Sequence, residues 1–156
     1  MSMVVPLSRM CEGEKGKIRK LELPPITRER LCGLGFVSGE EIQLIKVAPF
    51  GDPKVYRIKG TDITLRDDIS MWILVETSSI SLSYASKGDY LVSLINGGMG
   101  FRERLRLLGI EEGKGLTVIG NLGRRIEISV KGNYSTLSRG QAIDRQSTRL
   151  NSSHRI

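Results

Sequence analysis

The sequence contains an internal repeat. The pair Leu-Ser at 7–8 recurs at 82–83, a shift of 75, and the pattern Arg-x-Arg-Leu-x-x-Leu-Gly at 28–35 recurs at 102–109, a shift of 74. Later matches keep their order while the shift falls to 72, which is typical of short insertions in loops between fixed elements. Solenoid repeats are units of about 20 to 50 residues that cannot bury a core alone, and this period is longer. The repeat therefore predicts two compact domains that arose by duplication of one small fold.

The domain boundaries follow from the matched segments. We place the first domain at residues 7–76 and the second at 82–143, with a short polar linker around 76–79. Each domain has about 70 residues, a size at which one hydrophobic core leaves only a few kcal/mol of net stability. Both domains are therefore expected to be small modules of modest stability.

Residues 144–156 do not follow the repeat. The segment 144–154 resembles a translated sequencing-library adapter, so we expect 144–156 to be a tail that is not native. The first domain closes with the apolar run 73–75, whereas the same shift of 72 reaches Arg-Gln-Ser at 145–147. The second domain is therefore predicted to lack its last strand. Without the tail the chain loses three Arg and one Asp, which lowers its formal charge from +7 to +5, and it loses its only histidine.

The residue types that remain argue against an enzyme. Without histidine the body of the chain has no side chain whose unperturbed pKa lies near neutrality and no Ser-His or Cys-His nucleophile pair. The adjacent acids at 40–41, 67–68 and 111–112 are interpreted as solvated turn charges. The two cysteines, Cys11 and Cys32, have no metal-type spacing and are expected to be buried. With neither a signal peptide nor a long apolar run, the chain is predicted to be cytoplasmic.

Short apolar stretches between turn residues predict mostly strands. The strands expected in the first domain are 17–21, 42–47, 55–59, 63–66 and 72–75, and those in the second are 116–119, 125–130 and 134–138. One short helix per domain is expected, and in the first it runs from an N-cap at Thr27 to Leu34. Gly35-Phe36 and Gly109-Ile110 each predict a Schellman turn at the helix end. The pattern indicates an all-β fold of two small barrels.

Leucines three apart on each predicted helix share a face, and that face is expected to pack on the barrel. These leucines are Leu31, Leu34, Leu105 and Leu108. Arg28 and Arg30 are two apart and do not share a face. They are interpreted either as solvated charges or as anchors for an acidic partner surface, because a guanidinium binds carboxylates in a bidentate manner.

The ordered motifs resemble a known family. Leu-Ser, Gly-Glu, Arg-x-Arg-Leu-x-x-Leu-Gly-Phe, the loop Pro-Phe-Gly-Asp-Pro at 49–53, and Lys-Gly followed by Leu-Arg are similar to the FeoA domain. The loop is the most specific part of this resemblance, and the second domain departs there with Asn-Leu-Gly-Arg at 121–124. The resemblance implies two tandem SH3-like small barrels, mainly β with one short helix each.

The same resemblance implies a function in ferrous iron uptake. It implies a non-enzymatic cytosolic accessory that binds the cytoplasmic part of a FeoB-type membrane transporter. Partner contacts are predicted at the helix arginines and in the loop, with no catalytic or cofactor-binding residues. The predicted contact residues are Arg28, Arg30, Phe50, Asp52, Arg102 and Arg104.

Two other functions stay open at this point. The same barrel occurs as the terminal domain of iron-dependent repressors, so direct binding of Fe²⁺ or another divalent transition metal is one alternative, although Fe²⁺ sites usually draw on histidine. An SH3-like RNA-binding module is the other, because the formal charge of +7 suits phosphates. The basic residues are spread along the chain, however, and eight aromatic residues are too scattered for a stacking platform. Nucleic acid is therefore not favoured as a partner.

Overall fold

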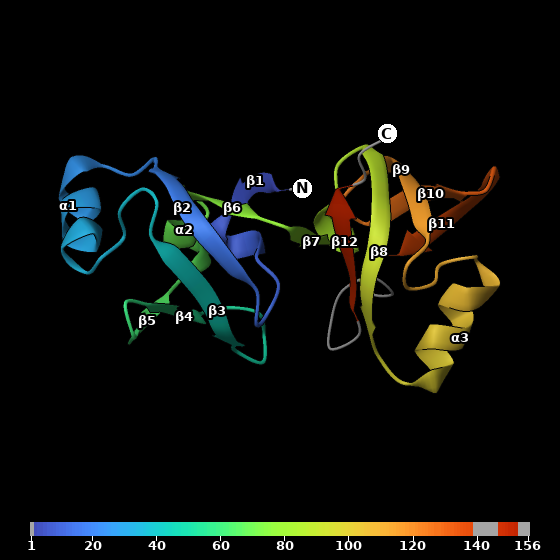
Figure 1. Ribbon diagram of the computed structural model, residues 1–156, viewed down its shortest axis with the longest axis horizontal. Helices are drawn as coiled ribbons and strands as arrows, with labels where there is room; N and C mark the ends of the chain where they lie inside the picture. Colours follow the sequence, from blue (N-terminus) through green and yellow to red (C-terminus); the bar gives the residue numbers. More distant parts are fainter. Residues whose placement is uncertain (1, 139–146, 153–156) are drawn as a thin grey trace. The chain divides into compact units, whose positions relative to one another are not determined.

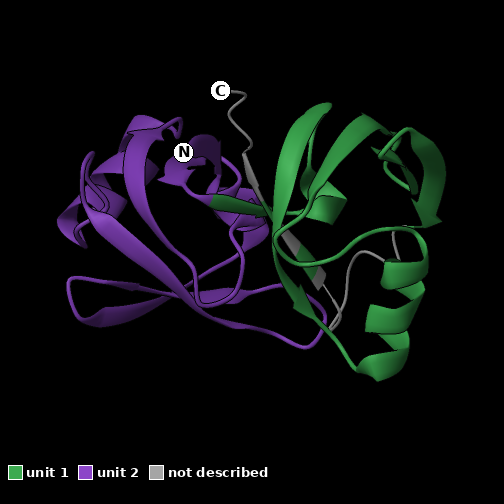
Figure 2. Cartoon of the chain, turned by 45° about the vertical axis from the view of Figure 1, so that its right-hand side comes forward, with its two compact units in different colours: residues 1, 79–156 green, residues 2–78 purple. Residues whose placement is uncertain are grey.

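The computed structural model describes residues 2–138 and 147–152, which form two compact units (Figures 1 and 2). The N-terminal unit, unit 2 of Figure 2, comprises residues 2–78. The C-terminal unit, unit 1 of Figure 2, comprises the described residues from Ser79 onward. The division between the units falls after Ser78, and the domain bounds 7–76 and 82–143 stay a prediction. Each unit has its own six-stranded sheet.

The N-terminal unit is a single antiparallel sheet with three short helical segments. Its strands pair in the order β1-β6-β2-β3-β4-β5. They are β1 (Met3–Pro6), β2 (Lys15–Leu21), β3 (Glu41–Val47), β4 (Lys54–Ile58), β5 (Thr61–Leu65) and β6 (Ile73–Thr77). The helical segments are the 3₁₀ turn η1 (Leu7–Arg9), α1 (Pro25–Gly33) and α2 (Asp67–Ser70). The predicted strands are all present, while β1 and α2 were not assigned from the sequence.

The C-terminal unit repeats this order of elements. Its sheet has the order β11-β10-β9-β8-β12-β7. The elements are β7 (Ser79–Ser81), η2 (Leu82–Tyr84), β8 (Gly88–Asn96), α3 (Met99–Leu107), β9 (Gly115–Asn121), β10 (Arg125–Val130), β11 (Asn133–Ser138) and β12 (Ser147–Ser152). Figure 1 shows α1 beyond the end of β2 and α3 beyond the end of β8. The all-β class with a short helix in each domain is confirmed.

Alternating burial explains why these segments are strands. Along β2, Gly16 and Ile18 are buried while Lys15, Lys17 and Arg19 are exposed, so one face meets the core and the other meets solvent. The same alternation places Ile42 and Leu44 of β3 and Tyr56 of β4 inside. The core of the C-terminal unit is built in the same way, from Val92, Val118, Ile126, Ile128 and Leu150.

The predicted absence of a last strand in the second domain differs from the structure. Within the tail, β12 pairs antiparallel with both β8 and β7, so it takes the place that β6 takes between β2 and β1. Leu150 lies opposite Val92 and Ile80, as Val75 lies opposite Ile18 and Val5. The segment β12 thus pairs with the edges of β7 and β8 that would otherwise be unpaired, and it places Leu150 in the core. That the tail is not native sequence stays a prediction.

Both predicted Schellman turns are present. In α1 the amide of Phe36 donates to Leu31 O and that of Gly35 donates to Cys32 O, both at 3.0 Å, and Gly35 has φ +107°. In α3 the amide of Ile110 donates to Leu105 O at 2.9 Å, and Gly109 has φ +83°. The apolar residue after each glycine is fully buried. Each glycine therefore folds the chain back onto its helix.

The predicted burial of the helix leucines is correct for one leucine in each pair. Leu31 and Leu105 are buried, but Leu34 is exposed and Leu108 is half-buried. Leu34 is the C-cap of α1, and the reversal at Gly35 puts Phe36 into the core in its place. The helix also begins earlier than expected, with Pro24 as N-cap and Pro25 at N1, a position where the fixed φ of proline suits a helix start.

Candidate partner-binding site

The outer side of α1 combines apolar and basic side chains. Ile26, Arg30 and Leu34 are spaced four apart, so they form an exposed stripe along one side of the helix, next to the side that buries Leu31. Ile26 is 84% exposed and Leu34 is 48% exposed. Neither Arg28 nor Arg30 has an ion pair with another described residue. Both guanidinium groups are therefore available to an acidic group from outside the chain.

The equivalent arginine of α3 is used inside the chain. The Nη2 atom of Arg102 donates to Ile95 O at 2.7 Å and lies 3.3 Å from Oε1 of Glu112, while the amide of Ile95 donates to the same oxygen at 2.9 Å. These bonds fix α3 to the end of β8. At a shift of 74 the position of Glu112 holds Ser38 in the N-terminal unit, which has no carboxylate to offer Arg28.

The second predicted arginine of α3, Arg104, is exposed and has no ion pair with a described residue. Its neighbours on the helix are paired, because Arg106 binds Glu103 in two hydrogen bonds. The bonds from Arg106 lower the pKa of Glu103, and the same contact raises the pKa of Arg106. Of the two helices, α1 thus offers the more open set of charges.

The loop between β3 and β4 presents an aromatic side chain at its tip. Phe50 is 99% exposed. The loop is closed by hydrogen bonds from the amide of Ala48 to Pro53 O at 3.1 Å and from the amide of Gly51 to Ala48 O at 2.8 Å. Asp52 connects the loop to α2, because the backbone amide of Asp67 at the start of α2 donates a hydrogen bond to Oδ1 of Asp52 at 2.9 Å. The loop therefore holds Phe50 outward on a fixed backbone.

An ion pair between a buried lysine and a partly exposed aspartate lies next to this loop. Lys54 at the start of β4 is 8% exposed, and its Nζ atom binds both carboxylate oxygens of Asp67 at 2.7 and 2.9 Å. Tyr56, two residues along the same face, is fully buried and donates to Leu7 O at 3.4 Å. Burial raises the pKa of Tyr56, with Asp67 adding to the shift. Asp67 thus connects β4, α2 and the loop.

The sequence analysis missed this ion pair. The signal was the period of two along β4, which puts Lys54 on the same face as Tyr56 and Ile58, where a lysine needs a buried partner. The acids at 67–68 were interpreted as solvated turn charges, and for Asp67 this interpretation is wrong. The sequence alone did not place α2 beneath the loop.

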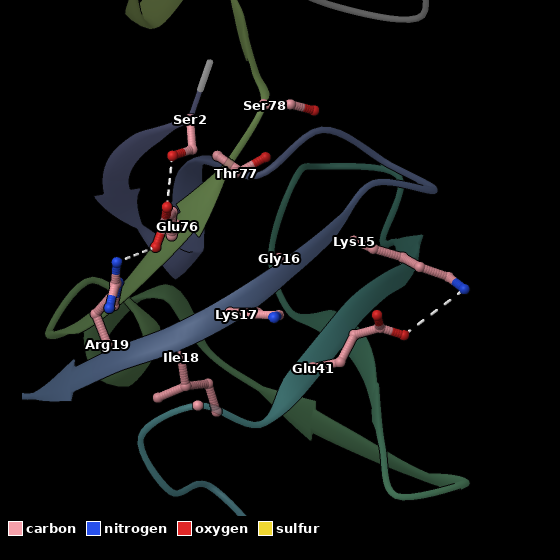
Figure 3. A pocket seen from close by; sticks show the side chains of 11 residues that line it. Ser2, Lys15, Gly16, Lys17, Ile18, Arg19, Glu41, Glu76, Thr77 and Ser78 are labelled. Carbon is pink, nitrogen blue, oxygen red and sulfur yellow. Dashed lines mark hydrogen bonds and ion pairs between the residues drawn. The ribbon is translucent and has the colours of Figure 1, made fainter.

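A shallow cleft of about 460 Å³ lies on the outer face of the same sheet (Figure 3). It is lined by charged residues of three neighbouring strands. Arg19 pairs with Glu76, and Lys15 lies 3.7 Å from Glu41. A hydrogen bond from Ser2 and the nearby Arg19 lower the pKa of Glu76. The cleft can bind charged groups, but its cations and carboxylates largely neutralise each other.

The remaining chemistry is limited within residues 2–138 and 147–152. No three or more His, Cys, Asp or Glu side chains gather there as a metal site would require. Cys11 is buried as expected, whereas Cys32 on α1 is exposed, and both are free thiols. No helix in the described ranges is both long and apolar enough to cross a membrane.

Comparison with known proteins identifies the N-terminal unit. The model of the family described as "FeoA domain" matches residues 5–77. The chain is 34% identical over 73 residues to the Fe(2+) transport protein A/Fe(2+) transporter FeoB fusion protein of Porphyromonas gingivalis, a match that covers 47% of this chain and 9% of the fusion protein. The chain therefore spans a small part of that relative.

Solved structures extend the likeness to both units. The solution structure of iron(II) transport protein A from Clostridium thermocellum is 36% identical, with a TM-score of 0.76, and the match covers 96% of this chain and 88% of that one. The crystal structure of Stenotrophomonas maltophilia FeoA with zinc, described as a prokaryotic SH3 domain protein, is 26% identical with a TM-score of 0.41 and covers 47% of this chain and 88% of that one. The chain belongs to the FeoA family, whose members are SH3-like small β barrels associated with ferrous iron transport.

Proposed function

We propose that this chain is a non-enzymatic accessory of ferrous iron transport that binds the cytoplasmic part of a FeoB-type transporter. The observation that carries the proposal is the fusion relative, in which a segment similar to 73 residues of this chain belongs to the same polypeptide as a transporter. A domain that works while joined to its partner has a high effective concentration at that partner. To act on that partner, the domain needs a surface that binds it.

Two features of the N-terminal unit are candidates for such a surface, and they lie at opposite ends of β3 (Figure 1). At one end α1 offers the stripe of Ile26, Arg30 and Leu34, with Arg28 on another side of the helix, and at the other end the loop offers Phe50. Exposed aromatic and arginine side chains are the residue types that dominate binding energy at protein interfaces. The partner surface that fits is apolar with acidic groups at its border. Asp52 is bound within the loop region and supports it, and Arg102 is bound within the C-terminal unit, so in this proposal neither contacts the partner.

The proposal places the chain in the cytoplasm with its partner. Two free thiols, one of them exposed, suit a reducing compartment. In this proposal the chain acts by binding and transfers no chemical group.

The binding experiment uses the full chain and the purified cytoplasmic part of a FeoB-type transporter. Arg28→Glu with Arg30→Glu is expected to weaken binding at least about tenfold, because two cations become two anions at the contact. Arg124→Glu with Arg125→Glu, at two exposed arginines of the C-terminal unit outside the predicted contact set, is the matched control and is expected to change binding little. Circular dichroism checks that each variant is folded. Absence of binding by the unmodified chain, or equal loss in the control, would overturn the proposal.

A further inference from the structure

The two sheets end in strands that match residue by residue. At a shift of 72, β5 corresponds to β11, and both strands are joined to their neighbour by a Lys-Gly turn. Lys59 and Lys131 have φ of 49° and 51°, and the following glycines have φ of 75° and 82°, as a type I′ turn requires. The pairing register is also the same. Any difference between the two edges therefore comes from the side chains alone.

The edge of β5 carries a charged pair. Arg57 lies opposite Asp62 and binds it in two hydrogen bonds at 2.8 and 3.2 Å. The contact lowers the pKa of Asp62, so the carboxylate stays ionised at neutral pH. A fixed charge on an edge strand discourages pairing with a second strand, because the new neighbour would strip water from it.

The edge of β11 has no such charged pair. The pair Arg57 and Asp62 is replaced at the same register by Ser129 and Tyr134. No residue of Asn133–Ser138 is charged and none is proline. Tyr134 is 78% exposed. Within the part of the chain that the structure describes, β11 pairs with β10 alone.

The hairpin geometry determines which backbone groups face outward. In a two-residue hairpin the residues beside the turn, Val130 and Asn133, exchange both backbone hydrogen bonds, and the pattern then alternates along the strands. Residues 134 and 136 therefore direct their N–H and C=O groups away from β10. They are spaced to accept a further antiparallel strand.

We propose that the outer edge of β11 pairs antiparallel with the same edge of a second copy of this chain. A two-fold axis at Ser135 sets Tyr134 opposite Thr136 of the other copy, an aromatic and β-branched combination that stabilises cross-strand pairs. The absence of charge makes the edge self-complementary, whereas the same pairing of two β5 edges would set the ionised Asp62 of each copy opposite Thr64 of the other and take water from the carboxylate. The contact is small, so the dimer is weak, with a dissociation constant of roughly 10 µM to 1 mM.

The test measures the mass of the full chain in solution at rising concentration, by sedimentation or light scattering. Thr136→Lys places two cations within the proposed contact and is expected to weaken dimerisation at least about tenfold. Thr64→Lys is the matched control, because Thr64 holds the equivalent place on β5, and it is expected to have no effect. Thr136 is exposed, so the variant should fold, and circular dichroism checks this.

Hydrogen exchange gives a second readout at the level of single residues. The amides of Tyr134 and Thr136 are expected to gain protection as the concentration rises, while those of Ser135 and Leu137 are already protected by β10. A chain that stays monomeric at about 1 mM would overturn the proposal. So would a dimer that Thr136→Lys leaves intact, or one in which the amides of 134 and 136 stay unprotected.

Discussion

The inward faces of β4 and β10 show how the two units use one fold differently. At a shift of 72, Lys54, Tyr56 and Ile58 of β4 correspond to Ile126, Ile128 and Val130 of β10, with the same register to the next strand. The N-terminal unit thus buries an amine and a phenol where the C-terminal unit buries hydrocarbon. The polar set supports the longer loop that carries Phe50, since Lys54 binds Asp67 and Asp67 binds Asp52. The C-terminal unit has a shorter turn and needs no such support.

The two helices differ in how many of their charges form ion pairs, and here the C-terminal unit has more of them. In α3 the charges are paired within the unit, through Arg102 with Glu112 and Arg106 with Glu103. In α1, Arg28 corresponds to Arg102 and has no ion pair with a described residue, and Cys32 stands at the position of Arg106. The C-terminal unit thus pairs two of its helix arginines and has an uncharged sheet edge, while the N-terminal unit leaves Arg28 and Arg30 open and carries a charged pair at its edge. The comparison teaches that a duplicated barrel can keep its core pattern while its surfaces take separate roles.

The largest effect is expected at the ion pair of Lys54 with Asp67. Asp67→Ala leaves Lys54 buried without a partner and is expected to lower the free energy of unfolding by roughly 2 to 3 kcal/mol, because Asp67 is itself partly solvated. Adding Lys54→Ile, the residue type that β10 carries, is expected to restore most of the loss. Chemical denaturation measures both. A double variant no more stable than Asp67→Ala would contradict the equivalence of β4 and β10.

The two Schellman glycines allow a direct comparison between the units. Gly35→Ala is expected to cost about 1 kcal/mol, because alanine is strained at positive φ. Gly109→Ala is expected to cost about 2 kcal/mol, because its added Cβ would also lie 3.0 Å from a Cγ of Val130, whereas at Gly35 the nearest atom belongs to the flexible stem of Lys59. Thermal unfolding of the two variants tests this order, and the reverse order would refute it.

Substitutions in the β3–β4 loop and in the equivalent β9–β10 turn test which unit binds the partner. Phe50→Ser is expected to weaken binding to the cytoplasmic part of the transporter about tenfold without changing the melting temperature, because the ring has no contacts to lose. Leu122 is the exposed apolar residue at the equivalent turn of the C-terminal unit, so Leu122→Ser is the matched control. Equal losses for the two variants would show that the binding surface is not confined to the N-terminal unit.

The smallest effect concerns the paired charges of α3. Because Arg106 lowers the pKa of Glu103 below its ordinary 4.5, the pair favours the folded state above pH 4.5 and loses this contribution as the pH falls through the lower folded pKa. NMR titration of the Glu103 carboxyl group is expected to show this low pKa and its return towards 4.5 in Arg106→Ala. The pKa of Glu76 in the other unit serves as an internal control and should not move.

Much of the fold was predictable because it depends on local chemistry. The period of two along β10 gave its bounds, and a glycine followed by an apolar residue gave both helix ends. The prediction for Leu34 was wrong because spacing along a helix does not tell where the chain reverses. The contact residues were assigned from the same motif in both units, yet only the structure separates the engaged Arg102 from the open Arg28.

The sequence by itself determined the repeat, the strand class and the family pattern, because these follow from residue order and from preferences that act over a few neighbours. Only the tertiary structure decided that Lys54 meets Asp67, that Asp52 braces the loop and that β12 lies between β7 and β8. These contacts join residues from 13 to 72 positions apart. Such pairs form only when the sheet has brought distant segments together, and no local pattern encodes which partners will meet.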